Sequence, residues 1–562
     1  MGWGPISAVR DIARLHEITS VFIRHGLGDL MRRAGVAGML ERAGQILRWG
    51  EASEARNLTP HQRLRSALEE LGPTFVKLGQ MLSTREDLLS PAWTEELERL
   101  QSRVAPVPFD ALLPQVEKAL GRSPFDVFVD LERESYASAS IAQVHRARLP
   151  NGTPVVLKIR RPGIVPKMEA DLRILAQVAD LIEIESAELR RYRPSRIVAE
   201  FRRSVERELD LAVEARNVER FARNFADDPN ILIPRVYWEW TSNIMNVQEH
   251  MEGIPGTDMA AIDAAALDRK VLAARGMDAV LKMILVDGFF QADPHPGNVF
   301  YLPGNRLVMI DFGMAGRIST TRRRQLIDLL TGIARQDEDA MLEVLREWTS
   351  EEVEDEERLA SDFGELAFDY ADTPLKELRI GPLLHRVSAV MREHSIVLPS
   401  DLTLMFKALI TLEGVGRQYD PDIRLVERIK PFIDRVATER YQPRAIAERG
   451  QAAVAQFFNL VTSLPRDLAR LVADARRGRL RVDLDLRRLD SFGRQLDRTL
   501  DRTTMGILTA SLVIGSSIIL TVQGGPQIFG VPILTVLGLA GYVLAFFNSL
   551  WIIYGIWRSG KR

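Results

Sequence analysis

The chain has 562 residues, more than one hydrophobic core ordinarily holds, so several domains are expected. Its 74 Lys plus Arg residues nearly balance its 76 Asp plus Glu residues, so no global attraction to nucleic acid is indicated. Cysteine is absent, which excludes disulfides, thiolate metal sites and cysteine nucleophiles, and is compatible with a reducing cytoplasmic setting.

The N-terminal part is predicted to be helical. Residues 1–57 are expected to form one or two amphipathic helices, and they show no secretory signal. Thr59 and Pro60 supply an N-cap and a first-turn proline, which predicts that a further helical segment begins there. That segment carries Lys77 and Gln80 on one face, three residues apart. A lysine on a surface helix is usually solvated, so this spacing alone identifies no site.

A strand pair is predicted within residues 126–165. A small-residue run from Ala137 to Ser140 precedes an alternating stretch, an Asn151-Gly152 turn and an apolar strand that carries Lys158. A small-residue turn lets a ligand approach the backbone, and a lysine on the second strand can face the same ligand, as in lobes that cover nucleotide phosphates. A strand edge followed by solvated arginines explains Lys158 equally well, so both interpretations stay open.

Two helices are predicted next, over residues 167–185 and 194–225. The second helix bears Glu208, Asp210 and Glu214. At about 100° per residue, Asp210 and Glu214 share a face while Glu208 points roughly 120° from Glu214. One helix can thus offer carboxylates to two lysines, although such carboxylates also commonly form a solvated face. The apolar segments that follow, ILIPRVYWEW and IMNVQEHMEG, are predicted strands that complete the first lobe.

The segment ADPHPGNVFYLPGNRLVMIDFGMAGR is predicted to contain a hairpin, because two apolar runs flank a Pro-Gly-Asn-Arg turn. If the turn is centred between Gly304 and Asn305, then Asn298 and Asp311 lie equally far from it and become cross-strand partners. Such a pair offers hard oxygen donors that suit Mg²⁺, with positions left for phosphate and water. Alternatively, Asn298 and Asp311 are ordinary loop residues that tolerate turn geometry and bind nothing. Asn305 is predicted to be such a turn residue.

Two uncharged apolar segments, residues 505–522 and 531–557, end the chain. Each is about long enough to cross a bilayer, and their connector is short, so a transmembrane helical hairpin is predicted. Basic residues flank both ends of the hairpin, so both termini are expected on the cytoplasmic side of the membrane. Two buried helices of a soluble domain are the alternative. Residues 435–502, rich in arginine, are expected to form a juxtamembrane helical segment.

The order of the motifs is more informative than any one of them. A small-residue turn, a strand lysine and a helix glutamate precede Asp293, Asn298 and the Asp311-Phe312-Gly313 motif. This is the order of the phosphoryl-transfer machinery in protein kinases. Over residues 58–430 the sequence therefore resembles the UbiB/AarF/ADCK family of atypical kinase-like proteins of ubiquinone biosynthesis. The marks of this resemblance are KxGQ as Lys77-Leu78-Gly79-Gln80, an alanine-rich loop, ExD as Glu208-Leu209-Asp210, the DPHPGN loop and DFG.

The resemblance implies an α+β, bilobal protein-kinase-like fold with an N-terminal helical extension and a C-terminal transmembrane helical hairpin. The implied divisions are an amphipathic helical region (1–57), a KxGQ extension (58–125), an N-lobe (126–252), a C-lobe (253–434), a juxtamembrane region (435–502) and two transmembrane helices (503–562).

The resemblance also implies ATP and Mg²⁺ as cofactors. Lys158 would contact the nucleotide phosphates and pair with Glu214, and Asp293 would be the catalytic aspartate. Asn298 and Asp311 would bind Mg²⁺. The nucleotide loop would consist of Ala137, Ser138, Ala139 and Ser140, and the regulatory residues over the pocket would be Lys77, Gln80, Glu208 and Asp210, with Lys77 near Glu208.

Two departures from the family pattern qualify these roles. Ser138 stands where the family commonly has alanine, and its hydroxyl could touch a phosphate or cap the following turn. Gln291-Ala292-Asp293 replaces His-Arg-Asp, so regulation through a phosphorylated activation segment is not expected. His295 could hold the loop or touch phosphate, and its position between two prolines favours a structural hydrogen-bonding role.

Three functions are compatible with the sequence. The favoured one is a membrane-anchored atypical kinase or ATPase that supports ubiquinone synthesis, with membrane lipid, quinone precursors and quinone-biosynthesis enzymes as partners and no nucleic acid. A nucleotide-responsive, non-catalytic scaffold for quinone-pathway enzymes is the first alternative. A small-molecule kinase of the aminoglycoside or choline type is the second, although such enzymes need neither KxGQ nor a membrane hairpin. The physiological substrate stays open, as does the oligomeric state, with a homodimer as one option.

Overall fold

The computed structural model describes residues 5–28, 58–100, 104–335, 338–348, 355–371, 379–425, 427–429, 431–432, 508–521, 527–528 and 531–559. Its contacts divide the chain into two compact units, Met1–Ile446 and Ala447–Arg562. The predicted juxtamembrane segment lies outside the described residues. The first unit contains the two predicted lobes.

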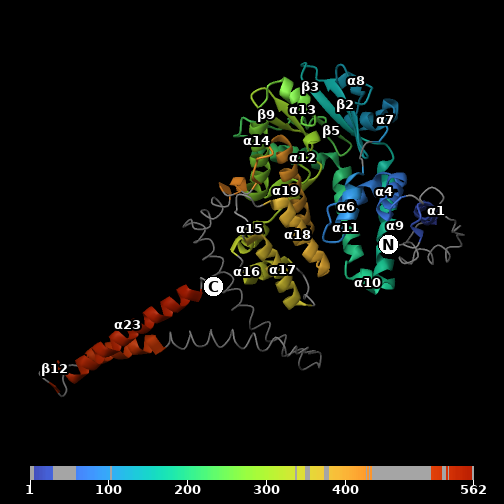
Figure 1. The fold of residues 1–562 in the computed structure, drawn as a ribbon. Helices are drawn as coiled ribbons and strands as arrows, with labels where there is room; N and C mark the ends of the chain where they lie inside the picture. The colour runs from blue at the N-terminus through green and yellow to red at the C-terminus, as the bar shows by residue number, and fades with distance from the viewer. Residues whose placement is uncertain are drawn as a thin grey trace. The chain divides into compact units, whose positions relative to one another are not determined.

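A helical extension packs beside the first lobe (Figure 1). Its helices are α1 (Pro5–Arg24), α4 (Pro60–Leu71), α5 (Pro73–Leu82), α6 (Pro91–Glu98), α7 (Phe109–Leu120) and α8 (Pro124–Val127). As predicted, α1 buries one apolar face, and Thr59 caps α4 by accepting a hydrogen bond from the Gln62 amide. The predicted helical segment is divided in two, because Gly72 has a φ of 96° and Pro73 follows it.

The first lobe is a four-stranded antiparallel sheet in the order β1-β2-β3-β5, accompanied by helices. These elements are β1 (Ala137–Ser138), β2 (Ala142–Arg148), β3 (Pro154–Arg160), β5 (Met245–Glu249), α9 (Ile164–Glu185), α10 (Ala187–Arg190), α11 (Pro194–Leu209) and α12 (Leu211–Asn224). The predicted Asn151-Gly152 turn joins β2 to β3, with Gly152 at a φ of 85°. Leu157 and Ile159 are fully buried on one face of β3, so strand alternation turns Lys158 to the other face.

The single long helix predicted over residues 194–225 is wrong, because the helix breaks at Asp210. Asp210 has an extended backbone, and its carboxylate accepts a 3.0 Å hydrogen bond from the Ala212 amide. An aspartate in this position satisfies a free amide at the beginning of a helix. Glu208 therefore lies at the end of α11 and Glu214 in the first turn of α12, and the rotation expected for one continuous helix does not apply.

The predicted strand over residues 231–240 is divided between the two lobes. Its regular part, β4 (Ile231–Leu232), pairs in parallel with β9 (Arg306–Met309). An isolated bridge between Val236 and Gln248 joins the rest of this segment to β5. The prediction that this segment completes the first sheet is therefore wrong for β4.

The second lobe combines small sheets with a helical layer (Figure 1). Its four-stranded sheet has the order β4-β9-β8-β6, and β7 pairs with β10. The additional elements are β6 (Ile254–Pro255), β7 (Phe289–Gln291), β8 (Val299–Leu302), β10 (Ala315–Arg317), α13 (Met259–Ala264), α14 (Arg269–Leu281), the π-helix η1 (Lys282–Asp287), the 3-10 helix η2 (Pro296–Asn298), α15 (Thr320–Arg335), α16 (Glu338–Trp348), α17 (Glu356–Ala371), α18 (Ile380–Glu393) and α19 (Ser400–Tyr419). Phe290, Phe312 and Phe363 are fully buried in its core.

The predicted hairpin of β8 and β9 forms with a different turn. Leu302 pairs with Arg306, which leaves a three-residue turn rather than a turn centred between two residues. Gly304 and Asn305 adopt left-handed backbone angles, with φ of 80° and 57°. Asn305 is thus a turn residue, as predicted.

This turn shifts the register of the hairpin by one residue from the prediction. Asn298 lies opposite Ile310, whose amide donates to the Asn298 carbonyl at 3.1 Å. Asn298 and Asp311 are therefore not cross-strand partners, and the prediction that the hairpin pairs them directly is wrong.

The described residues of the second unit include two helices that contact each other. Its elements are the helical residues 508–521, β11 (Gln527–Ile528), β12 (Val531–Pro532) and α23 (Ile533–Ser559). The Asn548 side-chain amide donates to the Thr509 hydroxyl at 2.7 Å, which links the two helices. Within the described ranges, no helix has both the length and the hydropathy of a membrane span.

Candidate active site

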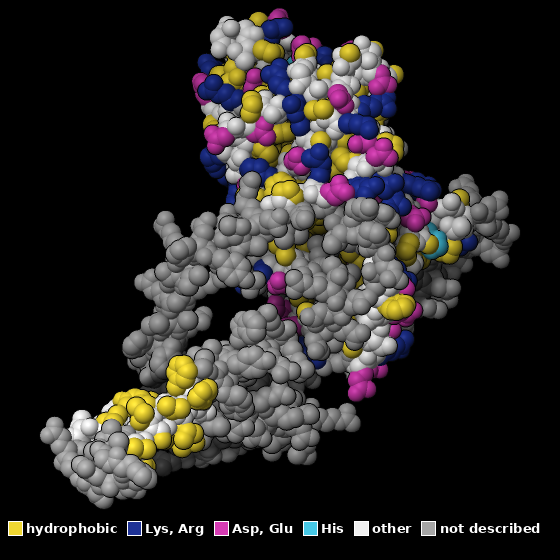
Figure 2. All heavy atoms as spheres, turned by 60° about the vertical axis from the view of Figure 1, so that its left-hand side comes forward, with side chains coloured by type: hydrophobic (Ala, Val, Ile, Leu, Met, Phe, Trp, Pro, Cys, Tyr) yellow, Lys and Arg dark blue, Asp and Glu magenta, His cyan; other side chains and the backbone are white. Residues whose placement is uncertain are grey.

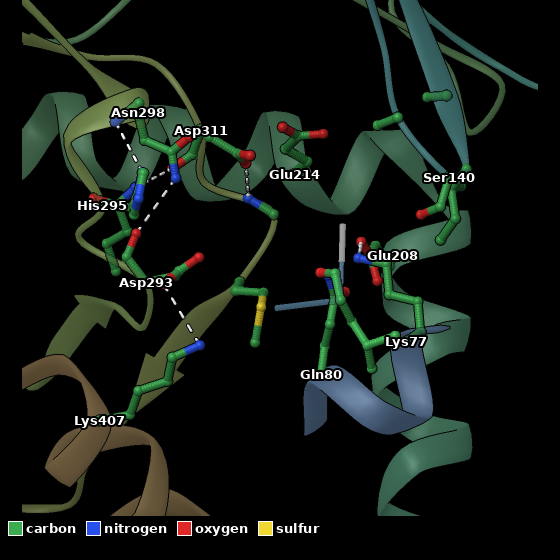
Figure 3. A pocket seen from close by; sticks show the side chains of 18 of the residues that line it. Lys77, Gln80, Ser140, Glu208, Glu214, Asp293, His295, Asn298, Asp311 and Lys407 are labelled. Atoms are coloured by element: carbon green, nitrogen blue, oxygen red, sulfur yellow. Dashed lines mark hydrogen bonds and ion pairs between the residues drawn. The ribbon is translucent and has the colours of Figure 1, made fainter. Parts of the chain in front are cut away.

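A cavity of about 1020 Å³ is lined by residues of the extension and of both lobes (Figure 3). The predicted site residues that line it are Lys77, Gln80, Ala139, Ser140, Lys158, Glu208, Glu214, Asp293, Asn298 and Asp311. Ala137, Ser138 and Asp210 were predicted with them but are not among the residues lining this cavity.

Lys158 and Glu214 form an ion pair at this cavity. Lys158 projects from β3 and Glu214 from α12, with 2.7 Å between Nζ and Oε1. The two side chains are only 25% and 7% exposed, so the alternative of a solvated strand edge is wrong. Burial alone would lower the pKa of Lys158, but the carboxylates of Glu214 and Asp311 outweigh burial and raise it. Lys158 is therefore held as an ammonium ion.

Asp311 is held as a carboxylate. Burial would raise the pKa of Asp311, but Lys158 and the Gly313 amide, which donates to Oδ1 at 2.9 Å, lower it below its ordinary value. The next residue, Phe312, is fully buried, and its ring centre lies 4.7 Å from that of Phe221. This aromatic contact fixes the backbone that carries Asp311 into the cavity.

The loop from Asp293 to Asn298 is shaped by its own hydrogen bonds. His295 Nδ1 accepts from the Gly297 amide at 3.0 Å, which is the kind of structural hydrogen bond predicted for His295, and His295 also lines the cavity. The Asn298 side-chain amide donates to the Asp293 carbonyl at 3.4 Å. The Asp293 side chain is 39% exposed and lines the cavity.

Asn298 and Asp311 line the same cavity despite the shifted register. A carboxylate and a side-chain carbonyl are hard oxygen donors of the kind that Mg²⁺ prefers, and Mg²⁺ usually keeps water and phosphate oxygens as further ligands. In the part of the chain that the structure describes, no cluster of three or more His, Cys, Asp or Glu side chains is arranged to hold a metal. The two donors fit a magnesium ion that is shared with a nucleotide.

The extension reaches the cavity through α5. Lys77 forms an ion pair with Glu208 at the end of α11, which is the proximity that the resemblance implied. Gln80 lies one turn further along α5, and its side-chain amide donates to the Leu100 carbonyl at 3.2 Å. This wall of the cavity is therefore polar and is tied to the first lobe. Asp210 caps α12 instead.

Gly79, within the KxGQ motif, lies at a close contact of α5. A methyl group there would lie 2.2 Å from Leu100 Cδ1 and 2.9 Å from Leu68 Cδ1, and both leucines are buried. We expect Gly79→Ala to lower the free energy of unfolding by about 1–3 kcal/mol through overpacking, measured by chemical denaturation. Gly414→Ala, at a helical position with no atom within 4 Å of the added methyl, should be neutral or stabilising. Equal stability of the Gly79 variant and wild type would contradict this packing.

The small-residue loop enters the cavity through Ala139 and Ser140. Ala137 and Ser138 form β1, and the Ser138 hydroxyl accepts a 2.6 Å hydrogen bond from Arg161. Ser138 is the residue that departs from the family pattern, and its hydroxyl links the loop to Arg161. Ser138 itself is not among the residues that line the cavity.

We expect Ala139→Gly to favour ATP over ADP. Glycine removes a methyl group and permits positive φ, so a backbone amide can approach a terminal phosphate. One added hydrogen bond to a charged group contributes about 1.5 kcal/mol, or about a tenfold rise in the ratio of the two affinities. Calorimetric titration with each nucleotide measures this ratio, with Ala137→Gly as the control outside the cavity. An unaltered ratio would count against a loop that faces phosphate.

Sequence reasoning missed Lys407. This lysine of α19 lines the cavity, and its Nζ lies 3.5 Å from Asp293 Oδ1. It is the single charged residue in the run LTLMFKALITL, and a lone charge among residues of a buried helix could have marked it. Glu98 of α6 was missed as well: it lines the cavity, and burial raises its pKa although Lys407 opposes this.

Comparison with known proteins gives consistent matches. The description "ABC1 atypical kinase-like domain" matches residues 99–345, "UbiB helical domain" residues 363–424 and "ABC1/UbiB kinase-like C-terminal domain" residues 487–558. A Pseudomonas aeruginosa protein named probable protein kinase UbiB is 35% identical over 466 residues, 81% of this chain and 87% of that protein. A protein of the same name from Marinobacter nauticus is 34% identical over 83% of this chain and 85% of its own length. The solved complex of Rv3197 with erythromycin, from Mycobacterium tuberculosis, has a TM-score of 0.43 and 21% identity, and covers 69% of this chain and 94% of that one.

Proposed function

Because the chain belongs to the ABC1/UbiB family of atypical kinase-like proteins, we propose that it is a membrane-anchored ATPase or phosphotransferase that supports ubiquinone biosynthesis. One observation carries the proposal. Lys158 and Glu214 lie far in the sequence from Asp293, Asn298 and Asp311, yet all five residues line one cavity. A positioned ammonium, two carboxylates and an amide are the groups that phosphoryl transfer from ATP requires.

Each residue has a separate task in the proposed reaction. Lys158, oriented by Glu214, binds the nucleotide phosphates. Asn298 and Asp311 would hold Mg²⁺, which supplies Lewis-acid neutralisation of phosphate charge when bound. Asp293, whose carboxylate faces the cavity, accepts the proton of the acceptor oxygen.

The extension favours a small or slender acceptor over a folded protein. The ion pair of Lys77 and Glu208 closes one wall of the cavity, and Gln80 continues that wall. Because ATP would occupy part of this cavity of about 1020 Å³, an acceptor must fit in the remaining space or enter as a flexible chain. We propose a lipophilic quinone precursor, or a phenol of similar size, as the acceptor or regulator at this wall.

Membrane anchoring by the C-terminal unit is part of the same proposal, with the kinase-like unit and both termini on the cytoplasmic side of the inner membrane. It is supported by the two long uncharged segments and by the basic residues at both ends of them. Apolar side chains also gather on the described surface of this unit, as Figure 2 shows in yellow. Those most exposed include Ile514, Ile518, Leu539, Leu544, Phe546 and Phe547.

The full-length protein in lipid nanodiscs tests this function. Binding of ATP with and without Mg²⁺ is measured by calorimetry, and phosphate release is measured with and without quinone-like phenols. We expect Mg²⁺-dependent binding and turnover that the phenols increase. Tight ATP binding without turnover under every condition would favour the nucleotide-responsive scaffold, and failure to bind ATP would contradict both functions.

A further inference from the structure

Lys407 is a cation of the candidate site to which the proposed reaction assigns no task. It points from α19 toward Asp293, as the dashed line between their side chains in Figure 3 shows. Its side chain is only 21% exposed, and Thr411, one turn further along α19, lines the same cavity. Phe406 and Leu409 are buried in the core on either side of it, so the helix holds Lys407 in a fixed position.

The contact between Lys407 and Asp293 is longer than a hydrogen bond. An ammonium that donates to a carboxylate ordinarily lies about 2.7–2.9 Å from it, whereas these two atoms are 3.5 Å apart. Lys77 and Lys158, by contrast, each donate to a glutamate. Lys407 therefore offsets the charge of Asp293 while its N–H groups can turn toward another oxygen in the cavity.

The loop that carries Asp293 supplies neither lysine nor arginine: its one basic residue is His295, whose Nδ1 accepts a hydrogen bond from the Gly297 amide. In phosphoryl transfer the moving group carries negative charge on three oxygens, and cations placed against those oxygens lower the barrier. Lys158, paired with Glu214, is one such cation, and it comes from the first lobe. A second cation beside Asp293 would lie where the terminal phosphate meets the acceptor.

We infer that Lys407 binds the terminal phosphate of ATP and aligns Asp293 with the acceptor, so that α19 supplies the positive charge that the loop lacks. This inference rests on the proposed function. In the transfer step, a bond forms between the acceptor oxygen and the terminal phosphorus. The bond from that phosphorus to the β–γ bridging oxygen breaks, and its electron pair leaves with ADP. Asp293 takes the acceptor proton, and Lys407 keeps its own protons throughout.

The experiment uses the full-length protein with ATP, ADP and Mg²⁺. Lys407→Met and Lys407→Gln remove the charge at similar length, and Lys407→Arg retains it. Lys270→Ala is the control, because Lys270 is a 69% exposed lysine of the same lobe that does not line the cavity. Affinity for each nucleotide, kcat and thermal unfolding are measured for every variant.

The uncharged variants are expected to weaken ATP binding by about tenfold relative to ADP binding, because ADP lacks the terminal phosphate. The kcat of the uncharged variants is expected to fall by about 10²-fold. Lys407→Arg should retain most of the preference for ATP and most of kcat, and Lys270→Ala should leave both unchanged. If Lys407 had only a structural role, its replacement would weaken the binding of ATP and of ADP by the same factor, which would contradict the inference. If wild type turns over ATP and a folded uncharged variant has the wild-type kcat and the wild-type ratio of ATP affinity to ADP affinity, then the role of Lys407 is overturned while the proposed function stands. Wild type that binds no ATP would overturn the proposed function with it.

Discussion

Asp311→Asn is expected to reduce ATP turnover by about 10²–10³-fold while the protein stays folded. The substitution removes the negative charge that suits a magnesium ion but keeps an oxygen that can accept from the Gly313 amide, as Asp311 does at 2.9 Å. Loss of one charge-stabilising group at a transition state typically costs about 3–4 kcal/mol, which is this range of rates. Phosphate release at saturating ATP and Mg²⁺ measures the effect.

A matched control distinguishes the effect of losing the Asp311 carboxylate from the effect of losing any one negative charge. Asp422 is 88% exposed and does not line the cavity, so Asp422→Asn should keep wild-type turnover. Thermal unfolding of both variants should resemble that of wild type. Turnover by folded Asp311→Asn at the wild-type rate would exclude Asp311 from the chemistry.

Lys158→Met is expected to abolish measurable ATP binding and to destabilise the first lobe. It removes the cation that two buried acidic groups share, namely Glu214, which is 7% exposed, and Asp311. Breaking a buried pair costs about 3–5 kcal/mol, and because Lys158 is 25% exposed we expect the lower end, about 3 kcal/mol. Chemical denaturation measures the loss of stability, and calorimetric titration measures the loss of binding.

The double variant Lys158→Met/Glu214→Leu provides the control for stability. It removes both members of the ion pair but leaves Asp311, so its free energy of unfolding should recover part of the loss seen in Lys158→Met. ATP binding should stay lost in the double variant. Recovery of binding together with stability would show that Lys158 acts only through folding and not on the nucleotide.

Local signals in the sequence predicted much of the first unit. Thr59 with Pro60 predicted the beginning of α4, and Asn151-Gly152 predicted the turn between β2 and β3, because in both cases the deciding contacts lie within a few residues. The order of the motifs, together with the family resemblance, predicted which distant residues would meet. Lys158 and Glu214 are the clearest example, 2.7 Å apart in the structure.

The errors occurred where one residue changes the local geometry. Asp210 could continue a helix or cap the next one, and hydrophobic periodicity does not distinguish the two. Glu208 and Glu214 do face two different lysines, but they do so because the helix breaks between them and not because of rotation along one helix. The left-handed Gly304 and Asn305 likewise shifted the hairpin register by one residue.

Other features depended on contacts that local patterns do not encode. Lys407 comes from α19, far along the chain from Asp293, and only the packing of that helix within the second lobe brings them together. Ser138 is drawn away from the cavity by Arg161, which lies on the far side of the β2 and β3 hairpin in sequence. Such long-range contacts need the tertiary structure or a known relative.

Quinone content in cells is the most direct test of the central claim that turnover at this site supports ubiquinone biosynthesis. The gene is deleted in its host, and the strain is complemented with wild type or with Asp311→Asn at equal protein levels. We predict that wild type restores ubiquinone and that Asp311→Asn leaves it low with accumulated prenylated precursors. Full restoration of ubiquinone by Asp311→Asn, or normal ubiquinone in the deletion strain, would contradict the account.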